Sequence, residues 1–492
     1  MATQMQEWRA IDTSWTCRVS EAGIRMFLRL FVCMAMALLG SSSLTSEPLT
    51  SHQQLALDIY KELVEIDTVV GQGDTARAAE AMAARLRTAG FSGPDVQVLA
   101  PAPRKGNLVA RLRGTGKRRP ILLLAHIDVV AAKREDWSVD PFRLTERDGY
   151  FYGRGTTDNK FMAAAFVANL IRYKQEGYTP DRDIILALET DEEIFDAYGV
   201  GILWLLAKHR HLIDAEFALN EGGRVGLKGG KPVWNSVQVS EKVVVIYKLE
   251  AKDKGGHSSQ PTKDNPIHRL AEGLARLAKF NFPFKLNDTT RAFFLRAAEA
   301  ESSQVAADMR AIVAGTAEPA ALAITRLSAS PFYNAQLRTT CTTTLVEGGH
   351  AVNALPQTAR ATLNCRVLPG EPIAEVGATL KRVLADDQIS IAQWGFPVLS
   401  TPSALHGEVM AAIEKLSAEF WPGVPVIPIM STGATDSTHL RNAGIPAYGH
   451  SGLADEVDDF RAHGKDERVP VKSFHDGHEY LYRLVKMLSG GG

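Results

Sequence analysis

Short apolar runs alternate with amphipathic helical patterns along most of the chain after residue 50. Residues 54–67 and 75–91 carry apolar side chains at helical spacing, whereas residues 119–130 and 182–193 each contain a continuous apolar run. This alternation is typical of an α/β sheet with helices on both faces, and fully apolar strands suit interior parallel positions. We therefore expect an α/β fold with a mainly parallel sheet flanked by helices.

The pattern changes near residue 240 and returns near residue 400. Between them, "KVVVIYKLEAKD" and "ARATLNCRVLPG" alternate like antiparallel strands. We predict one α/β domain in two segments, 47–240 and 396–492, interrupted by a smaller α+β domain at 241–395. An alanine-rich stretch at 297–327 has helical spacing and predicts extra helices around 285–330.

The first residues resemble a secretory signal. Arg25 and Arg29 precede an apolar run at 30–39, and small residues follow at 40–43. We expect the signal to lie within residues 1–46, with Met26 as its start, and the protein to be secreted or periplasmic. The run is too short to span a bilayer, which needs about 20 residues, so no stable membrane insertion is expected. The alternative is an amphipathic N-terminal helix.

Charge and cysteine content further limit the classes of protein to which this chain can belong. Basic and acidic residues nearly cancel, 55 against 56, so no overall field favours nucleic acid. Cys17 and Cys33 fall in the predicted signal region, which leaves Cys341 and Cys365. These two form a disulfide if their strands are neighbours in an oxidising compartment, and otherwise are buried thiols.

Five separated segments carry side chains that can bind a metal ion. Most of these side chains follow an apolar run or lie in a glycine-rich turn: His126 and Asp128, Asp158, Glu192 and Glu193, Glu221, and His463. Taken singly, each is more often a solvated or hydrogen-bonded residue. Together they concentrate negative charge that favours a bound cation. Imidazole with carboxylate suits zinc, or manganese and cobalt.

The ordered series "HIDVV", "GRGTTDNK", "TDEE", "NEGG", "GGHSSQP", "STGATDST" and "HGKDERV" resembles the co-catalytic zinc peptidase family. That family includes aminoacylases, carnosinases, glutamate carboxypeptidase and acetylornithine deacetylase. The resemblance runs from about residue 50 to the C-terminus and is strongest to the carboxypeptidase S-like and N-acyl-amino-acid hydrolase branch. It implies two zinc ions per subunit and a homodimer formed through the inserted lid domain.

The resemblance also implies a role for each metal-binding residue. Asp158 would bridge two metals. His126 and Glu221 would complete the ligands of one metal, and Glu193 and His463 those of the other. Glu192 would be the general base for the water between the metals, and Asp128 would orient His126. Some relatives have Asp where this chain has Asn220, and in them that Asp is a ligand. Asn is a poor zinc ligand, so Glu221 is the expected one.

In the inserted domain, His257 matches a histidine that stabilises the oxyanion across the family's dimer. Asn353 and Arg366 match positions that hold the substrate's carboxylate, and the turn with Gly433 and Thr435 would add backbone donors. Read without the family, His257 is an ordinary loop residue and Arg366 a solvated strand charge.

The resemblance implies a hydrolase that cleaves a peptide or amide bond next to a free carboxylate, of carboxypeptidase or dipeptidase type. An N-acyl-amino-acid hydrolase with the same mechanism is the alternative, because the sequence leaves the acyl side open. A non-catalytic metal-binding homologue is a distant alternative, since Glu192 and all five ligand positions hold competent residues.

Overall fold

The computed structural model describes residues 48–194, 200–315 and 317–490. The predicted signal region, with its expected start at Met26, lies outside the described residues. All helices and strands named below belong to one unit, Ser51–Gly492. Among the described residues, no helix is both long and apolar enough to cross a membrane.

The stretch before the insertion alternates helices and strands, as its sequence pattern predicts. Its α-helices are α2 (Ser51–Glu65), α3 (Thr75–Thr88), α4 (Lys160–Gln175), α5 (Ile202–Lys208) and α6 (Arg210–Ile213). Its strands are β1 (Val96–Ala102), β2 (Lys105–Leu112), β3 (Ile121–His126), β4 (Thr145–Arg147), β5 (Tyr150–Tyr152), β6 (Ile184–Glu189), β7 (Phe217–Asn220), β8 (Val225–Lys228) and β9 (Lys231–Glu241).

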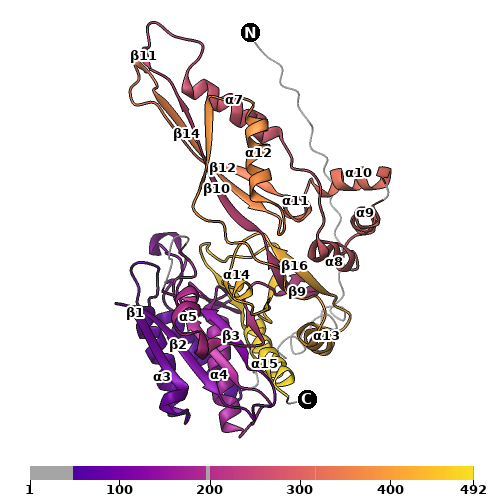
Figure 1. Ribbon diagram of the computed structural model, residues 1–492. Coiled ribbons are helices and arrows are strands. Elements are labelled where there is room, and N and C mark those ends of the chain that lie inside the picture. The colour runs from indigo at the N-terminus through magenta and orange to yellow at the C-terminus, as the bar shows by residue number, and fades with distance from the viewer. Residues whose placement is uncertain (1–47, 195–199, 316, 491–492) are drawn as a thin grey trace, which may run out of the picture. The chain divides into compact units, whose positions relative to one another are not determined.

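The stretch after the insertion returns to the same kind of structure. It contains α13 (Glu408–Phe420), β16 (Val426–Ser431), α14 (Ser437–Asn442), β17 (Ala447–Gly449), β18 (Ala454–Glu456), β19 (Arg468–Pro470) and α15 (Val471–Leu488). Both stretches contribute strands to one ten-stranded sheet in the order β1-β2-β6-β3-β7-β17-β9-β8-β18, with β16 beside β9, and β19, β5 and β4 form a separate three-stranded sheet. Figure 1 labels β1, β2, β3, β9 and β16 of the larger sheet.

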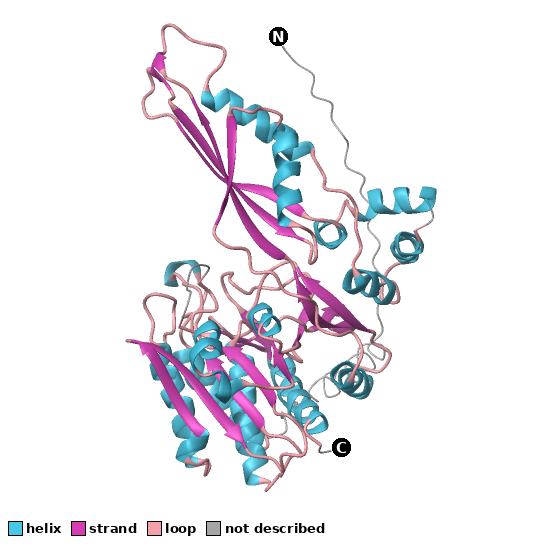
Figure 2. Cartoon of the chain, viewed as in Figure 1, coloured by secondary structure: helices cyan, strands magenta, loops and turns pink. Residues whose placement is uncertain are grey.

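Helices cover both faces of this sheet (Figure 2). On β3, Leu123 packs into the cluster that includes α2, α4, α13 and α15, whereas Leu122 and Leu124 pack into the cluster that includes α5, α6 and α14. Because alternate side chains of a strand point to opposite faces, a wholly apolar strand is buried on both. This is the α/β architecture that the sequence predicts.

The order of the central strands places the predicted metal ligands at one edge. Strands β6, β3 and β7 are neighbours and parallel. His126 ends β3, Glu192 and Glu193 follow β6, and Glu221 follows β7. Because the carboxyl ends of parallel strands meet at the same edge, three distant parts of the sequence bring their side chains together there.

The insertion contains a second, antiparallel sheet in the order β12-β14-β10-β15, packed under α7 and α12. Its elements are β10 (Val243–Lys252), β11 (Gly256–His257), α7 (Pro266–Lys279), β12 (Thr340–Gly348), β13 (Ala354–Leu355), β14 (Thr358–Val367), α12 (Ile373–Leu384) and β15 (Ile389–Trp394). The predicted boundaries at 241 and 395 lie at the ends of β9 and β15. The division into separate domains stays a prediction.

Extra helices occur in the region predicted to hold them. They are α8 (Asp288–Ala297), α9 (Ser303–Ala314), α10 (Ala317–Leu327) and α11 (Pro331–Leu337). Phe294 and Met309 of this group cluster with Ile427 of β16. The helices therefore pack against the ten-stranded sheet, although the sequence places them inside the insertion.

Cys341 and Cys365 form a disulfide between β12 and β14, where they are directly opposite each other. Sequence alone left pairing and free thiols both open, because it does not give strand register. Since β12 is an edge strand, the bond fastens the edge of this sheet to its centre.

Candidate metal centre

His126 is held rigidly at the end of β3. Its ring is buried, and its Nδ1 lies 3.0 Å from the backbone carbonyl oxygen of Asp128. The other ring nitrogen, Nε2, points at two carboxylates, 3.1 Å from Asp158 Oδ1 and 3.6 Å from Glu221 Oε2. The carbonyl fixes the ring so that Nε2 is the atom available to a metal.

Asp158 lies between two imidazoles. Its Oδ1 faces His126 and its Oδ2 lies 3.1 Å from Nε2 of His463, which is also 2.9 Å from Glu193 Oε1. One carboxylate thus presents an oxygen to each of two separate groups of donors. This is the arrangement that a bridging ligand between two metal ions requires.

The structure distinguishes the two candidates at the end of β7. Glu221 faces His126, whereas the buried Asn220 turns away and donates from Nδ2 to the hydroxyl of Ser437 at 3.0 Å. Asn220 is therefore engaged elsewhere, and Glu221 is the residue whose oxygen reaches the cluster.

The electrostatics of the cluster fit bound cations. Two donor groups lie close enough to hold an ion, His126 with Asp158 and Glu193, and His126 with Glu192 and Glu221. Burial raises the pKa of Glu221 to about 7, although the neighbouring His126 favours its carboxylate form. Burial and then the charge of Glu221 raise the pKa of Glu192 well above its ordinary range. A divalent cation would stabilise these crowded carboxylates, and the nitrogen and oxygen donors suit zinc, cobalt or manganese.

Asp128 contacts both His126 and the loop that follows β6. Its carboxylate accepts the backbone N–H of Glu193 at 3.1 Å and that of Glu192 at 3.3 Å, while its Oδ1 is 3.7 Å from Nδ1 of His126. The backbone carbonyl of Asp128, rather than its carboxylate, makes the close contact with His126. Asp128 therefore shapes the loop that carries the two glutamates.

A buried ion pair joins the loops that carry Asp158 and His463. Arg154 lies 2.6 Å from Glu467, and both side chains are almost fully buried. Arg154 also donates to the backbone carbonyl of Gly464 at 2.9 Å. Glu467 accepts backbone N–H groups from the opposite loop, at Gly155 (3.1 Å), Thr157 (2.8 Å) and Asp158 (3.2 Å).

Sequence reasoning missed both members of this pair. They lie inside the motifs "GRGTTDNK" and "HGKDERV", but a motif does not reveal which charged residue is buried against which. The only sequence signal for their role was that Arg154 lies in the same motif as Asp158 and Glu467 in the same motif as His463. Through them the two loops are held in register with each other.

Replacing Glu467 with glutamine should loosen this support. The substitution keeps the shape but leaves the buried Arg154 without a counter-charge, which costs about 3–5 kcal/mol of unfolding free energy. Loss of such support typically weakens metal binding by about 10–100-fold. Urea unfolding and a metal titration measure both effects. Glu419→Gln, in an exposed pair with Arg483, is the matched control and should change stability by under about 0.5 kcal/mol. Equal behaviour of the two variants would contradict the supporting role.

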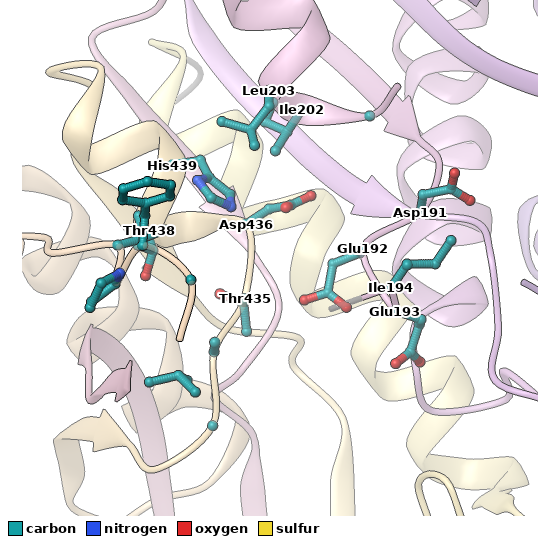
Figure 3. A pocket seen from close by; sticks show the side chains of 18 of the residues that line it. Asp191, Glu192, Glu193, Ile194, Ile202, Leu203, Thr435, Asp436, Thr438 and His439 are labelled. Carbon is teal, nitrogen blue, oxygen red and sulfur yellow. The ribbon is translucent and has the colours of Figure 1, made fainter. Parts of the chain in front are cut away.

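A cavity of about 720 Å³ adjoins the cluster. Glu192, Glu193 and His463 line one side of it, and Arg366 and Thr435 line other parts. Figure 3 shows the carboxylate of Glu192 pointing across the cavity toward Thr435. The predicted ligands and base thus border a space that can hold a small molecule.

The predicted backbone donors of the 433–436 turn are engaged within the protein. The N–H of Thr435 donates to Glu241 Oε2 at 3.1 Å and its hydroxyl to Glu241 Oε1 at 2.7 Å. The N–H of Gly433 donates to the hydroxyl of Ser431 at 3.0 Å. These two N–H groups hold the turn in place and are not directed at a substrate.

His257 and Asn353 lie together but outside the cavity. They adjoin in the short ribbon of β11 and β13, where the N–H of Ser258 donates to the carbonyl of Asn353 at 3.0 Å. Both side chains are exposed, and Figure 1 shows β11 at the end of the insertion remote from β9. Within one chain, neither residue reaches the metal-ligand cluster.

Comparison with known proteins places these features in a family. The model of peptidase family M20/M25/M40 matches residues 122–487. The N-fatty-acyl-amino acid synthase/hydrolase PM20D1 of Mus musculus is 30% identical over 75% of this chain and 74% of its own. The probable carboxypeptidase S-like 2 of Dictyostelium discoideum is 29% identical over 75% and 71%.

The fold is also that of a solved family member. The M20 family metallo-carboxypeptidase Sso-CP2 from Sulfolobus solfataricus has a TM-score of 0.65 at 18% identity, over 88% of this chain and 98% of its own. The predicted fold class and family resemblance are confirmed. The chain belongs to peptidase family M20/M25/M40 and is a hydrolase of its metallopeptidase and amidohydrolase type.

Proposed function

We propose that this chain is a dizinc hydrolase that cleaves an amide bond next to a free carboxylate. The observation that carries the proposal is the position of Asp158, whose two carboxylate oxygens each lie 3.1 Å from a different imidazole. His126 and Glu221 would hold one ion and Glu193 and His463 the other. Cobalt or manganese fits the same donors.

When bound, the ions would supply Lewis-acid polarisation of the substrate carbonyl and a more acidic water. Glu192 would take the proton of the attacking water and deliver it to the leaving nitrogen. Its backbone is fixed by Asp128, and its side chain points into the cavity (Figure 3). Glu192 can therefore serve both steps without leaving the site.

Arg366 supports recognition of a carboxylate. Its Nε donates to Asn364 Oδ1 at 3.1 Å, and among the described residues no acidic side chain pairs with it. The buried Lys242 also lines the cavity. Lys242 Nζ donates to the carbonyl of Arg338 at 2.7 Å and burial lowers its pKa to about 7, so the charge that faces a substrate is that of Arg366. An arginine fork suits a carboxylate.

Two substrate classes fit this mechanism. Peptides would make the chain a carboxypeptidase or dipeptidase, like the solved metallo-carboxypeptidase from Sulfolobus solfataricus. N-acyl amino acids are favoured by the name of the mouse relative, an N-fatty-acyl-amino acid synthase/hydrolase. Screening dipeptides against N-acetyl and N-fatty-acyl amino acids with the zinc-loaded protein tests both. If the protein hydrolyses neither class of substrate, the proposed function is wrong.

We also propose that the protein is secreted or periplasmic. The disulfide between Cys341 and Cys365 supports an oxidising compartment, as does the signal-like pattern at residues 1–46. Fractionation of cells expressing the full chain tests this. Recovery of the protein from the cytosol with free thiols would contradict it.

A homodimer would account for the position of His257. In one chain this exposed histidine is remote from the cavity, so it can act on a substrate only in a neighbouring subunit. Strand β12 is a sheet edge with Leu345 and Val346 exposed, which suits contact with a second copy. The dimer is thus part of the proposed active site.

A further inference from the structure

A second cavity, of about 440 Å³, lies in the insertion and shares no lining residue with the cavity beside Glu192. It is bordered by the end of α7, the connection from α7 to α8, helix α11 and the first residues of β12. Its size is within the range of cavities that bind small molecules. The hydrolysis proposed above uses none of its residues.

Arg338 is the charged residue among the described residues that line this cavity, and none of them is acidic. It lies between the end of α11 at Leu337 and the start of β12 at Thr340, with 8% of its surface exposed. Burial removes most of the hydration of the guanidinium and so lowers the pKa of Arg338 below its ordinary range. A charge buried in this way requires compensation by an opposite charge.

The other buried arginines of the described ranges have this compensation. Each lies 2.6–3.1 Å from a glutamate oxygen: Arg154 from Glu467, Arg182 from Glu216 and Arg441 from Glu241. Arg338, by contrast, forms no ion pair with any acidic side chain that the structure describes, and no nearby acid raises its pKa. Its positive charge is therefore the one among these arginines that the protein leaves unbalanced.

Arg338 also has unused hydrogen-bond donors. Its Nη1 donates to the carbonyl of Phe282 at 3.2 Å and its Nη2 to the hydroxyl of Ser328 at 3.0 Å. The buried Nε has no partner in the part of the chain that the structure describes. A guanidinium carries more N–H groups than these two partners use, in a planar fork that matches the oxygens of a carboxylate or a phosphate.

The rest of the lining combines polar groups with an apolar surface. Asn281 and the threonines at the start of β12 border the cavity, as does Asn334, whose buried amide oxygen has no partner among the described residues. Phe280 and Phe282 form an apolar part of the wall, with ring centroids 5.1 Å apart. A buried cation beside an aromatic wall favours a ligand with an anionic group on an apolar body.

We propose that the cavity at Arg338 binds a small organic anion, which carries a carboxylate or phosphate group on an apolar body. The anionic group would pair with the guanidinium, and the body would lie against Phe280 and Phe282. This site goes beyond the proposed hydrolase function and does not depend on it, because the two cavities have no lining residue in common.

The test titrates the zinc-loaded protein by calorimetry with benzoate and with phenyl phosphate, which share a body and differ in the charged group. At least one of them should bind, and a preference for either identifies the group that the site takes. Arg338→Gln should weaken this binding about tenfold or more, because hydrogen bonds to a charged group contribute that much. Acetate lacks the ring and should bind about tenfold more weakly than benzoate. Equal affinities for acetate and benzoate would overturn the assignment of an apolar body.

Anions can also bind at the metal-ligand cluster and at Arg366, so a second variant assigns the signal. Arg366→Gln should leave the binding at Arg338 unchanged. If Arg366→Gln abolishes all binding of both probes and Arg338→Gln changes nothing, the proposal is wrong. It is equally wrong if neither probe binds the unmodified protein.

Asn281→Glu tests the site without removing the buried arginine. Asn281 is exposed at the border of the cavity, so a carboxylate there should repel the anion and weaken binding about fivefold or more. Gln388→Glu adds the same charge at an exposed position of the insertion that lines neither cavity, and is the matched control. Equal affinities of these two variants would overturn the proposal.

Ligand binding should also appear as added stability. A saturating concentration of the tighter probe should raise the melting temperature of the unmodified protein and of Gln388→Glu, because the probe binds only the folded cavity. Arg338→Gln should show little of this rise. An equal rise in Arg338→Gln would place the anion elsewhere and contradict the proposal.

Discussion

Glu192→Ala should keep its bound metal and lose about a hundredfold or more in turnover, whereas Glu193→Ala should lose metal from one site. The two residues are adjacent but their side chains differ in place. Glu193 Oε1 is 2.9 Å from His463 Nε2, and Glu193 also lies in one donor group with Asp158 and His126. Glu192 lies in the other group, with His126 and Glu221, and its carboxylate points into the cavity, where a substrate and water would lie (Figure 3). Metal analysis and steady-state kinetics on both variants measure the difference.

Glu192→Gln is the matched control because it keeps the size of the side chain and removes the base. It should behave like Glu192→Ala in turnover and like the unmodified protein in metal content. If Glu192→Ala and Glu193→Ala hold the same amount of metal, the assignment of base and ligand is wrong.

Mixing two inactive variants should restore activity if the site is shared between subunits. Glu192→Ala and His257→Ala homodimers should each be nearly inactive. A mixed dimer has one site without either group and one with an intact Glu192 that receives His257 from the partner chain. With random exchange about half the dimers are mixed, so activity should approach about a quarter of the unmodified level.

Differential tags show whether subunits have exchanged, and Phe332→Ala mixed with Glu192→Ala controls for exchange alone. No recovery after confirmed exchange would mean that His257 serves its own subunit or has no catalytic role. An active monomer by light scattering would contradict the shared site directly.

Much of the fold followed from local pattern. Helix α3 was expected over 75–91 and spans Thr75–Thr88, where the side chain of Asp74 caps its start by accepting the Arg77 N–H at 2.8 Å. Strands β3 and β6 could be predicted as apolar runs because both of their faces are buried. Periodicity and capping are properties of neighbouring residues, so one sequence is enough to predict them.

The clustering of the proposed ligands was predictable for a different reason. His126, Asp158 and Glu221 are remote in sequence, but each stands at the end of a strand or turn whose partners are given by α/β topology. Between Asn220 and Glu221, side-chain chemistry alone favours Glu221, because Asn is a poor zinc ligand. The structure adds the geometry: Glu221 Oε2 lies 3.6 Å from His126 Nε2, whereas Asn220 donates to Ser437.

What could not be predicted depends on contacts between distant segments. The Arg154–Glu467 pair and the Asp128 carboxylate beneath the acidic loop join parts of the chain that no local pattern relates. The disulfide depended on the register of β12 against β14. The packing of α8 on β16 likewise depends on which surface the folded sheet leaves uncovered.

Metal content tests the central claim most directly. The purified protein should hold about two divalent ions per chain by elemental analysis, since Asp158 presents an oxygen to each of two donor groups. Dialysis against a chelator should abolish hydrolysis and lower the melting temperature, and zinc, cobalt or manganese should restore both, because metal binds the folded ligand set. Full hydrolytic activity in strict chelator, with no metal detected, would contradict the account.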